Sequence, residues 1–209
     1  MARTRIKICG VTRVQDAVGA AELGAAFVGL NFWPGSPRFL SVEAARRITK
    51  EVEAKVQVVG VFVNQPVGQV QEIASHVGLD LLQFHGDEGP GPVGTFGDRA
   101  IKVFRVDSSF DASVLHDFPD VWAYLFDCDH PTLLGGSGVS WPYERVSGMR
   151  HEKPVIVAGG LRPTNVRQAI AKSGADIVDV SSGIESRPGV KDPELMKQFI
   201  HEVHHAEEE

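Results

Sequence analysis

The sequence has little cysteine and no long apolar run, and each absence excludes a class of protein. Cys9 and Cys128 are the only cysteines among 209 residues, which argues against a disulfide scaffold and fits a reducing cytoplasm. The longest apolar run that contains glycine, Leu23–Leu30, is far shorter than the roughly 20 residues of a membrane span. Because no apolar stretch follows the basic N-terminal residues, we expect no secretory signal.

The charges also lack any block of one sign. Twenty-one Lys and Arg residues against 27 Asp and Glu residues give a formal charge of −6, and the basic residues are scattered, so we expect no nucleic-acid partner. The 22 glycines exceed the average of roughly 7%. Since no linker or low-complexity segment divides the chain, residues 1–209 are interpreted as one catalytic domain, with 205–209 as a frayed acidic tail.

Short apolar runs alternate with longer amphipathic segments along the whole chain. The runs predict strands at Ile6–Cys9, Ala26–Phe32, Val56–Val63, Leu79–Phe84, Ala100–Val106, Val121–Phe126, Pro154–Ala158 and Asp176–Val180. Helical spacing, with Asp16 among the start signals, predicts helices at Arg13–Leu23, Val42–Val52, Val67–His76, Asp111–Asp117, Thr164–Lys172 and Pro193–His204. Weaker segments at 86–97 and 141–148 are compatible with short helices.

Eight strands that alternate with helices predict the α/β class and a single-domain (βα)₈ TIM barrel with a closed parallel sheet. Such a barrel usually takes about 250 residues and can shrink to about 200. The main alternative is an open, doubly wound sheet whose first βα turn reads G-x-G-x-x-G. The first turn here reads Cys9-Gly-Val-Thr12, which favours the barrel.

Two glycine clusters follow the seventh and eighth strands, where barrels of this fold usually bind phosphate. Gly159 and Gly160 follow the seventh strand, and Ser182 and Gly183 follow the eighth. Either cluster alone is well explained as a tight turn. The pair favours a phosphate site, because bare backbone lets amide N–H groups approach an anion.

Cys9 and Asp127 each end a buried strand, and each has two interpretations. Cys9 is either a small core residue or a thiolate base, the latter if Lys7 faces inward and lowers its pKa. Asp127 either caps the next loop or donates a proton, because partial burial raises the pKa of a carboxyl group. On opposite sides of a barrel mouth, the two groups could act on the two sides of one small substrate.

Other polar residues gather at the same strand ends. Arg38 lies in a loop with two flanking prolines and is either a surface residue or a carboxylate-binding fork. Asp179 lies within an apolar strand, as a core ion pair or as an acceptor for a substrate hydroxyl. Gln83 and His85 share the fourth strand end, and no ligand spacing makes His85 a metal ligand, so we predict a hydrogen-bonding role. His201, His204 and His205 have helical ligand spacing, but a solvated terminus explains them better.

Taken together, these motifs resemble phosphoribosylanthranilate isomerase of tryptophan biosynthesis. The matching segments, in order, are Lys7–Gly10, Val61–Asn64, Leu82–Gly86, Gly135–Gly138, Ala158–Leu161 and Val178–Gly183. The resemblance extends from Lys7 to the Pro188–Asp192 segment and so covers nearly all of the chain. Two departures are the Val139–Tyr143 segment, where the family usually shows an aromatic-Asp-Trp pattern, and Val103-Phe104, where a small residue is common.

The resemblance implies an Amadori rearrangement of a small phosphorylated substrate, N-(5-phosphoribosyl)anthranilate, without metal or cofactor. Cys9 would be the general base and Asp127 the general acid. Arg38 would lie beside the anthranilate, Asp179 near the substrate, and Gln83 and His85 among the substrate-binding residues. Phosphate would be held at Gly159, Gly160, Ser182 and Gly183. The enzyme would work in the cytoplasm, away from any membrane, as a monomer or a homodimer.

Two alternatives remain at this stage. The isomerase of the histidine pathway runs the same chemistry on a related barrel, but it has an aspartate where Cys9 stands and resembles two half-barrel repeats, and no half-repeat is visible here. The second alternative is a catalytically silent phosphate-binding paralogue that serves a partner protein. The pair of Cys9 and Asp127 argues against it.

Overall fold

The computed structural model describes residues 3–107, 109–127, 146–147 and 153–206. Eight parallel strands form a closed barrel in chain order, and β1 pairs with β8 to close it. They are β1 (Arg5–Ile8), β2 (Phe27–Asn31), β3 (Gln57–Phe62), β4 (Leu81–Phe84), β5 (Ala100–Arg105), β6 (Ala123–Asp127), β7 (Val155–Ala158) and β8 (Ile177–Val180). The predicted (βα)₈ barrel is confirmed, with each strand inside or within a residue of its predicted bounds.

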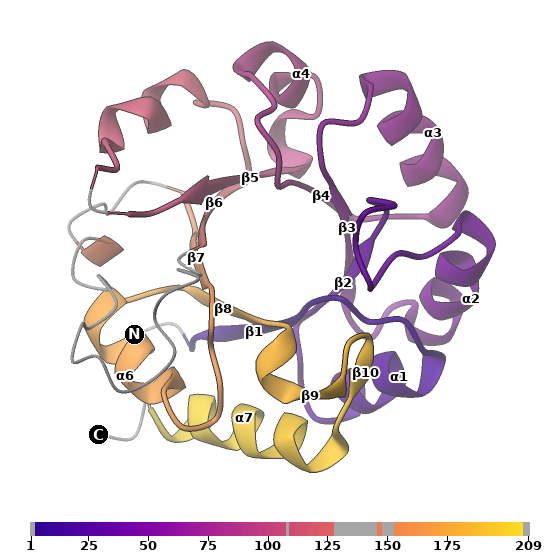
Figure 1. Ribbon diagram of the computed structural model, residues 1–209, viewed down its shortest axis with the longest axis vertical. Coiled ribbons are helices and arrows are strands. Elements are labelled where there is room, and N and C mark those ends of the chain that lie inside the picture. Colours follow the sequence, from indigo (N-terminus) through magenta and orange to yellow (C-terminus); the bar gives the residue numbers. More distant parts are fainter. Residues whose placement is uncertain (1–2, 108, 128–145, 148–152, 207–209) are drawn as a thin grey trace.

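Helices surround the barrel as an outer ring (Figure 1). They are α1 (Val14–Glu22), α2 (Val42–Val52), α3 (Val67–Val77), α4 (Pro90–Gly94), α6 (Val166–Ser173) and α7 (Pro193–His205), with 3₁₀ turns η1 (Gly97–Arg99), η2 (Ala112–Asp117) and η3 (Ser182–Ile184). The helix predicted over Asp111–Asp117 is instead the 3₁₀ helix η2. Within the described ranges, none of these helices has the length and apolar character needed to cross a membrane.

Local sequence signals explain most helix ends. The Ser41 side chain accepts a hydrogen bond from the Ala44 amide to start α2, and Asp192 does the same for two amides at the start of α7. α3 and α6 end at Gly78 and Gly174, which take the left-handed conformation that glycine tolerates. Asp16 lies in the first turn of α1, as predicted, and this helix begins without a side-chain cap.

Two apolar layers support the barrel. The larger one fills the space between strands and helices. The smaller one fills the barrel interior with residues from successive strands: Phe27, Val59, Leu81, Ile101, Val103, Ala123, Leu125, Ile156, Ala158 and Ile177. At the N-terminal end of β1, the Arg5 guanidinium lies 5.2 Å from the ring centroid of Phe27 and 5.6 Å from that of Trp122. The interior is therefore packed, and polar chemistry is left to the carboxyl ends of the strands.

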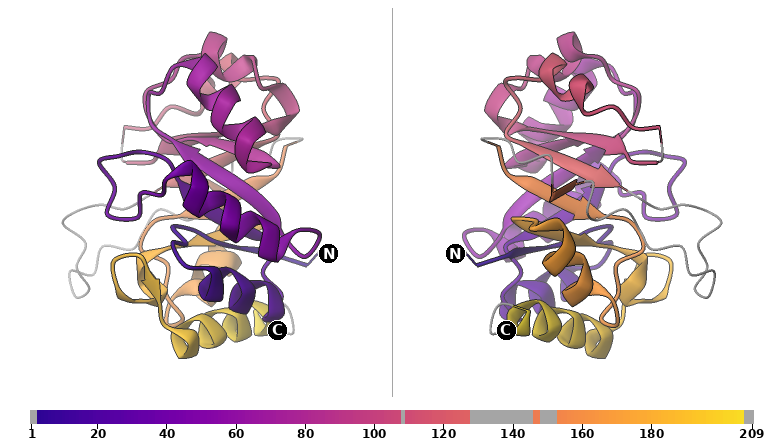
Figure 2. Two further views of the ribbon diagram at one scale, coloured as in Figure 1. Left: turned by 90° about the vertical axis from the view of Figure 1, so that its right-hand side faces the viewer. Right: turned by 90° about the vertical axis from the view of Figure 1, so that its left-hand side faces the viewer.

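A short hairpin follows η3 and was not predicted from the sequence. β9 (Glu185–Arg187) pairs with β10 (Val190–Lys191), and Gly189 between them has a φ of 79°. Pro188-Gly189 is a turn signal between two polar segments, which is the clue that the sequence offered. The hairpin and the loop after β2 lie at the end of the barrel opposite the N-terminus (Figure 2).

Gly183 is needed for the packing of two neighbouring loops. A Cβ atom on this residue would overlap the carbonyl oxygen of Leu161, which is backbone and cannot rotate away. We therefore expect Gly183→Ala to lower the free energy of unfolding by about 1–3 kcal/mol in a denaturant titration. Gly68→Ala in α3 is the matched control, because nothing lies within 4 Å of its Cβ position. Equal midpoints for the two variants would contradict this assignment.

Candidate active site

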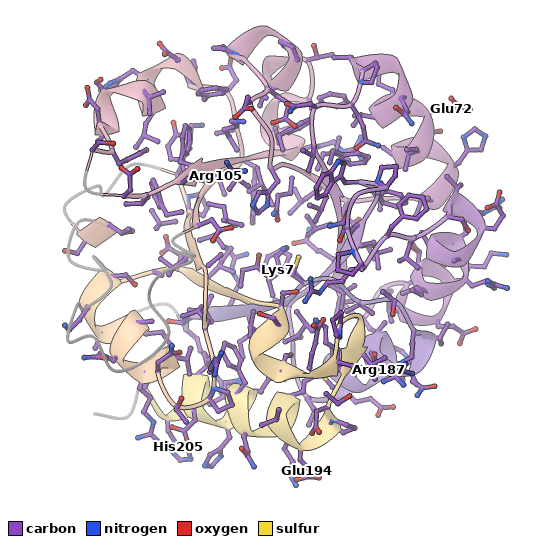
Figure 3. The ribbon with its side chains drawn as sticks, viewed as in Figure 1. Lys7, Glu72, Arg105, Arg187, Glu194 and His205 are labelled. Atoms are coloured by element: carbon purple, nitrogen blue, oxygen red, sulfur yellow. The ribbon has the colours of Figure 1, made fainter. Side chains whose placement is uncertain are left out.

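A buried ion pair lies across the seam where the barrel closes. Lys7 on β1 and Asp179 on β8 are register partners, and Lys7 Nζ lies 2.8 Å from Asp179 Oδ2. Both side chains are buried, and Figure 3 shows Lys7 near the middle of the ring, far from peripheral residues such as Arg187. Of the two interpretations of Asp179, the ion pair is thus present. Its other oxygen, Oδ1, is buried without a hydrogen-bond partner among the described residues.

Cys9 follows β1 and lies beside this pair. Its amide donates to the Val180 carbonyl oxygen at 2.8 Å, which ties it to the end of β8. Across from it, Gly29 on β2 leaves the space that the thiol occupies: a Cβ atom there would lie 2.8 Å from Cys9 Sγ and 3.3 Å from Lys7 Nζ. The small residue at position 29 therefore allows thiol and ammonium to share the barrel mouth.

The charges around Cys9 act in opposite directions. Burial raises the pKa of the thiol and the Asp179 carboxylate raises it further, while Lys7 and Lys191 lower it; the net pKa lies above the ordinary value. For Lys7, burial disfavours the charge, but Asp179 and Cys9 outweigh it and raise the pKa. Lys7 faces inward, as the thiolate interpretation required. Its effect on the thiol is partly cancelled by Asp179.

Asp127 ends β6 and belongs to a chain of three polar side chains. Its Oδ2 lies 3.0 Å from His85 Nε2, and His85 Nδ1 lies 3.0 Å from Gln83 Nε2. As the Gln83 amide donates to Nδ1, a neutral His85 donates its Nε2–H to Asp127. Gln83 is buried, and its Oε1 has no hydrogen-bond partner among the described residues. Of the two β4 residues predicted to bind substrate, His85 thus contacts Asp127, and Gln83 contacts His85.

A second buried ion pair holds the loop after β4 and was missed in the sequence. Lys102 on β5 donates to the Gly86 carbonyl oxygen at 2.8 Å and to Glu88 at 3.0 Å. Glu88 in turn accepts from the amides of Asn64 and Gly86. Because Gly86 adjoins His85, this pair fixes the backbone from which His85 reaches Asp127. Glu88 gave no signal, since a Glu in a loop is usually exposed.

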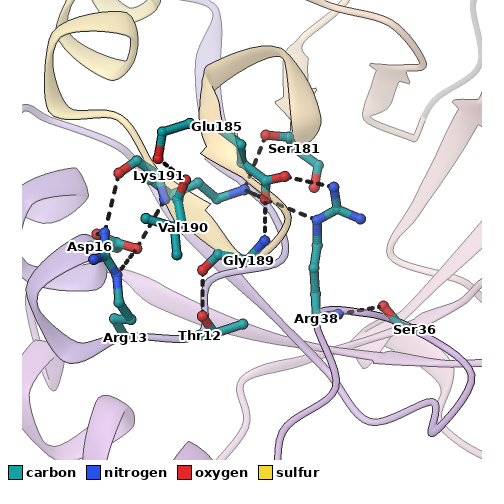
Figure 4. A network of polar contacts seen from close by, with 11 residues as sticks. Thr12, Arg13, Asp16, Ser36, Arg38, Ser181, Glu185, Gly189, Val190 and Lys191 are labelled. Atoms are coloured by element: carbon teal, nitrogen blue, oxygen red, sulfur yellow. Dashed lines mark hydrogen bonds and ion pairs between the residues drawn. The ribbon is translucent and has the colours of Figure 1, made fainter.

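Arg38 was expected to bind a carboxylate with its guanidinium group. In the structure this group already binds a carboxylate of the chain itself. Its Nε and Nη2 donate to Glu185 at 2.9 and 2.6 Å. Glu185 also accepts from Lys191 at 2.8 Å (Figure 4). Burial disfavours ionisation of Glu185, but hydrogen bonds from the two cations outweigh it and hold its pKa below the ordinary value. Burial lowers the pKa of Lys191 more than Glu185 raises it.

The glycines after β7 and β8 come together at the same end of the barrel. Gly159 and Gly160 have φ values of 94° and 64°, and the Cβ position of Gly160 faces open space. Asn165 steadies this loop by donating to the Gly160 carbonyl oxygen at 3.0 Å. Gly183 touches the same loop at Leu161. The two predicted phosphate loops are therefore in contact.

Some sequence predictions fall outside the described residues: Cys128, the Gly135–Gly138 cluster and the departure at Val139–Tyr143. The tail is described as far as residue 206, with His205 still in α7 and its ring 4.2 Å from that of His201. In the described part of the chain, no group of three or more His, Cys, Asp and Glu residues could hold a metal ion.

The balance of charge around Cys9 makes a testable prediction. Asp179→Asn removes a negative charge and leaves Lys7 free to favour the thiolate, so the pKa of Cys9 should fall. In a Cys128→Ser background, the pH at which iodoacetamide alkylation of Cys9 reaches half its maximal rate should move to lower pH. Asp98→Asn, at an exposed position, is the control. An unchanged or higher midpoint for Asp179→Asn would contradict the prediction.

Known proteins match this chain along nearly its whole length. The family model for N-(5′-phosphoribosyl)anthranilate (PRA) isomerase matches residues 6–202. The PRA isomerase of Azotobacter vinelandii is 44% identical over 208 residues, which cover 99% of this chain and 100% of that protein. The crystal structure of the Thermotoga maritima enzyme is 37% identical, with a TM-score of 0.87, and the match covers 96% of this chain and 98% of that one.

A further solved structure carries a ligand. It is a phosphoribosyl anthranilate isomerase in complex with reduced 1-(o-carboxyphenylamino)-1-deoxyribulose 5-phosphate, 34% identical with a TM-score of 0.84, and the match covers 96% of this chain and 98% of that one. Family model, full-length relatives and barrel geometry agree, and none of them matches only a shared fragment. This chain belongs to the N-(5′-phosphoribosyl)anthranilate isomerase family.

Proposed function

We propose that Asp127 is the general acid and Cys9 the general base of the reaction that this chain catalyses. That reaction is the Amadori rearrangement of N-(5-phosphoribosyl)anthranilate to 1-(2-carboxyphenylamino)-1-deoxyribulose 5-phosphate in tryptophan biosynthesis. The observation that supports the assignment is that a thiol after β1 and a carboxyl group at the end of β6 lie at the end of the barrel where the glycine loops meet.

The acid step begins at Asp127. Its proton passes to the furanose ring oxygen of the substrate, the bond from that oxygen to C1′ breaks, and the amine lone pair forms a Schiff base. Asp127 must be protonated to act as the acid. Its hydrogen bond with His85 must then reverse direction, because a protonated carboxyl group donates where the carboxylate accepted. If the Gln83 amide turns over, Oε1 accepts from Nδ1–H and His85 Nε2 becomes an acceptor for the Asp127 proton.

The base step uses the thiolate of Cys9. It removes the C2′ proton, the electron pair moves into the C1′–C2′ bond, and the resulting enolamine tautomerises to the ketone. Lys7 stabilises the thiolate, and the free Oδ1 of Asp179 is available to accept the C2′ hydroxyl. The tautomerisation adds a proton at C1′ and removes the proton of the C2′ hydroxyl, so two protons are given and two are taken over the whole rearrangement.

The phosphate of the substrate would lie between the loops after β7 and β8. The N–H groups of Gly160, Ser182 and Gly183 form no hydrogen bond to another described residue, and the space above Gly160 is open. Amide donors suit an anion in a protein of net charge −6, because they attract it locally without side-chain charge. Gly159, with its left-handed backbone, turns the loop toward this position.

We further infer that the enzyme works in the cytoplasm as a single catalytic domain, with its small phosphorylated substrate as the principal partner. It would be a monomer or a homodimer; a relative from Thermotoga maritima is described as dimeric. Trp33 and Phe39, exposed on the loop after β2, are the apolar side chains best placed for a subunit contact.

The roles of acid and base are tested by single substitutions. With phosphoribosylanthranilate generated in situ and turnover followed by anthranilate-type fluorescence, Cys9→Ser and Asp127→Asn should each lower kcat by about 10²–10⁴. Cys128→Ser and Asp120→Asn are the matched controls and should stay near wild type. A folded wild-type protein without turnover would overturn the activity, and a near-normal Cys9 or Asp127 variant would overturn that residue's role.

The phosphate loop is tested at Gly160. Its φ of 64° and its open Cβ position mean that a valine would strain the turn and cover the amides. Gly160→Val should therefore mainly raise KM, with inorganic phosphate losing potency as a competitive inhibitor in parallel. Gly94→Val, where no atom lies within 4 Å of the Cβ position, is the control. A change in kcat alone would contradict phosphate binding at this loop.

A further inference from the structure

The β9–β10 hairpin presents two buried charges to Arg38. Glu185 binds the guanidinium through both oxygens, and Lys191 Nζ bonds to Glu185 and to the Ser181 carbonyl oxygen at 3.1 Å. The Lys191 side chain is 0% exposed and that of Glu185 is 4% exposed, so neither is a solvated surface charge. The family reaction as described above gives no task to either residue.

Arg38 is oriented by this contact and still has a donor to offer. Glu185 occupies Nε and Nη2, while Nη1 forms no hydrogen bond to any described residue. Figure 4 shows that nitrogen directed away from the hairpin. The aliphatic part of Arg38 crosses directly over Gly10, whose missing side chain gives it room, and so it runs beside Cys9. The carboxylate of Glu185 thus fixes one edge of the guanidinium and leaves its other edge at the mouth.

The hairpin is itself held firmly against the start of the barrel. The amide of Lys191 donates to Asp16 at 3.1 Å, and Arg13 holds Asp16 from the other side at 2.6 and 2.9 Å. The Thr12 hydroxyl donates to the Gly189 carbonyl oxygen. Asp16, predicted to start a helix, is therefore an anchor for β10. Because these contacts come from the loop after β1 and the first turn of α1, Arg38 is fixed relative to Cys9.

The charges of this group do not cancel. Arg38 and Lys191 contribute two positive charges and Glu185 contributes one negative charge, so one positive charge is left. A net positive charge of these three side chains at a partly buried position favours an anionic neighbour, and both the Cys9 thiolate and an anionic ligand can fill that role. The phosphate has its own backbone site across the mouth, and the planar edge of Arg38 matches a carboxylate.

We propose that Glu185 is a positioning residue for Arg38, and that with Lys191 it makes the site selective for substrates whose aromatic ring carries a carboxylate. The inference rests on the proposed function, in which Arg38 faces the anthranilate ring. It adds that the selectivity comes from the hairpin, whose buried carboxylate holds the guanidinium in one orientation while the buried lysine keeps the group cationic.

Two ligands that differ only in the ring carboxylate test this proposal. One is the reduced product analogue, 1-(2-carboxyphenylamino)-1-deoxyribitol 5-phosphate, and the other is the same compound without the carboxyl group. Calorimetry gives Kd for each with wild type, Glu185→Gln and the exposed hairpin control Arg187→Gln. Glu185→Gln should weaken the carboxylated ligand about 10- to 100-fold and the other ligand by less than about 3-fold.

These outcomes distinguish a failure of the proposed carboxylate selectivity from a failure of the proposed catalytic activity. Equal weakening of both ligands by Glu185→Gln would mean a merely structural hairpin, and no weakening would remove Glu185 from the site; either result overturns the proposal. Glu185→Asp, which keeps the charge, gives the same comparison if the glutamine variant does not fold. In an Arg38→Lys background, Glu185→Gln should add little. Wild-type turnover with no preference for the carboxylated ligand would leave the activity standing and overturn the selectivity alone.

Discussion

The ion pair between Lys7 and Asp179 is the constraint on which the rest of the site depends. It joins the first and last strands, and its burial means that removing either partner leaves the other charge unpaired at a cost in stability. Because the lysine must remain ionised to satisfy the aspartate, a cation is permanently available beside the Cys9 thiol. The same aspartate limits how far that cation can lower the thiol pKa, so the thiol is held between two opposing charges.

Other buried ion pairs lie around the barrel mouth, and each holds a different part of it in place. Lys102 and Glu88 hold the loop that carries His85, and Glu185 with Lys191 holds Arg38. In each, a buried lysine supports a carboxylate that in turn supports backbone or a guanidinium. The groups assigned to chemistry, Cys9 and Asp127, are less enclosed than these supporting charges. Buried, fixed charges therefore position the more exposed groups to which we assign the chemistry.

The fold followed from the sequence because its signals are local. Apolar runs such as Val155–Ala158 and helix signals such as Ser41 depend on neighbours within a few residues, and they gave the barrel its strands and helices. The positions of Cys9 and Asp127 at strand ends followed in the same way. The ion pairs around the barrel mouth could not be predicted in this way, since Lys7 and Asp179 are 172 residues apart and Arg38 and Glu185 are 147 apart. Only closure of the barrel brings such pairs together, and no local pattern marks them.

Closure across β1 and β8 also determines when an active molecule can exist. The lysine lies on the first strand of the barrel, whereas its aspartate lies on the last strand and the hairpin that holds Arg38 follows that strand. A shorter chain would have to leave Lys7 unpaired in an apolar interior or keep the sheet open. The charged surroundings of the Cys9 thiol are therefore assembled only when β8 pairs with β1, because both partners of the buried ion pair are then in place.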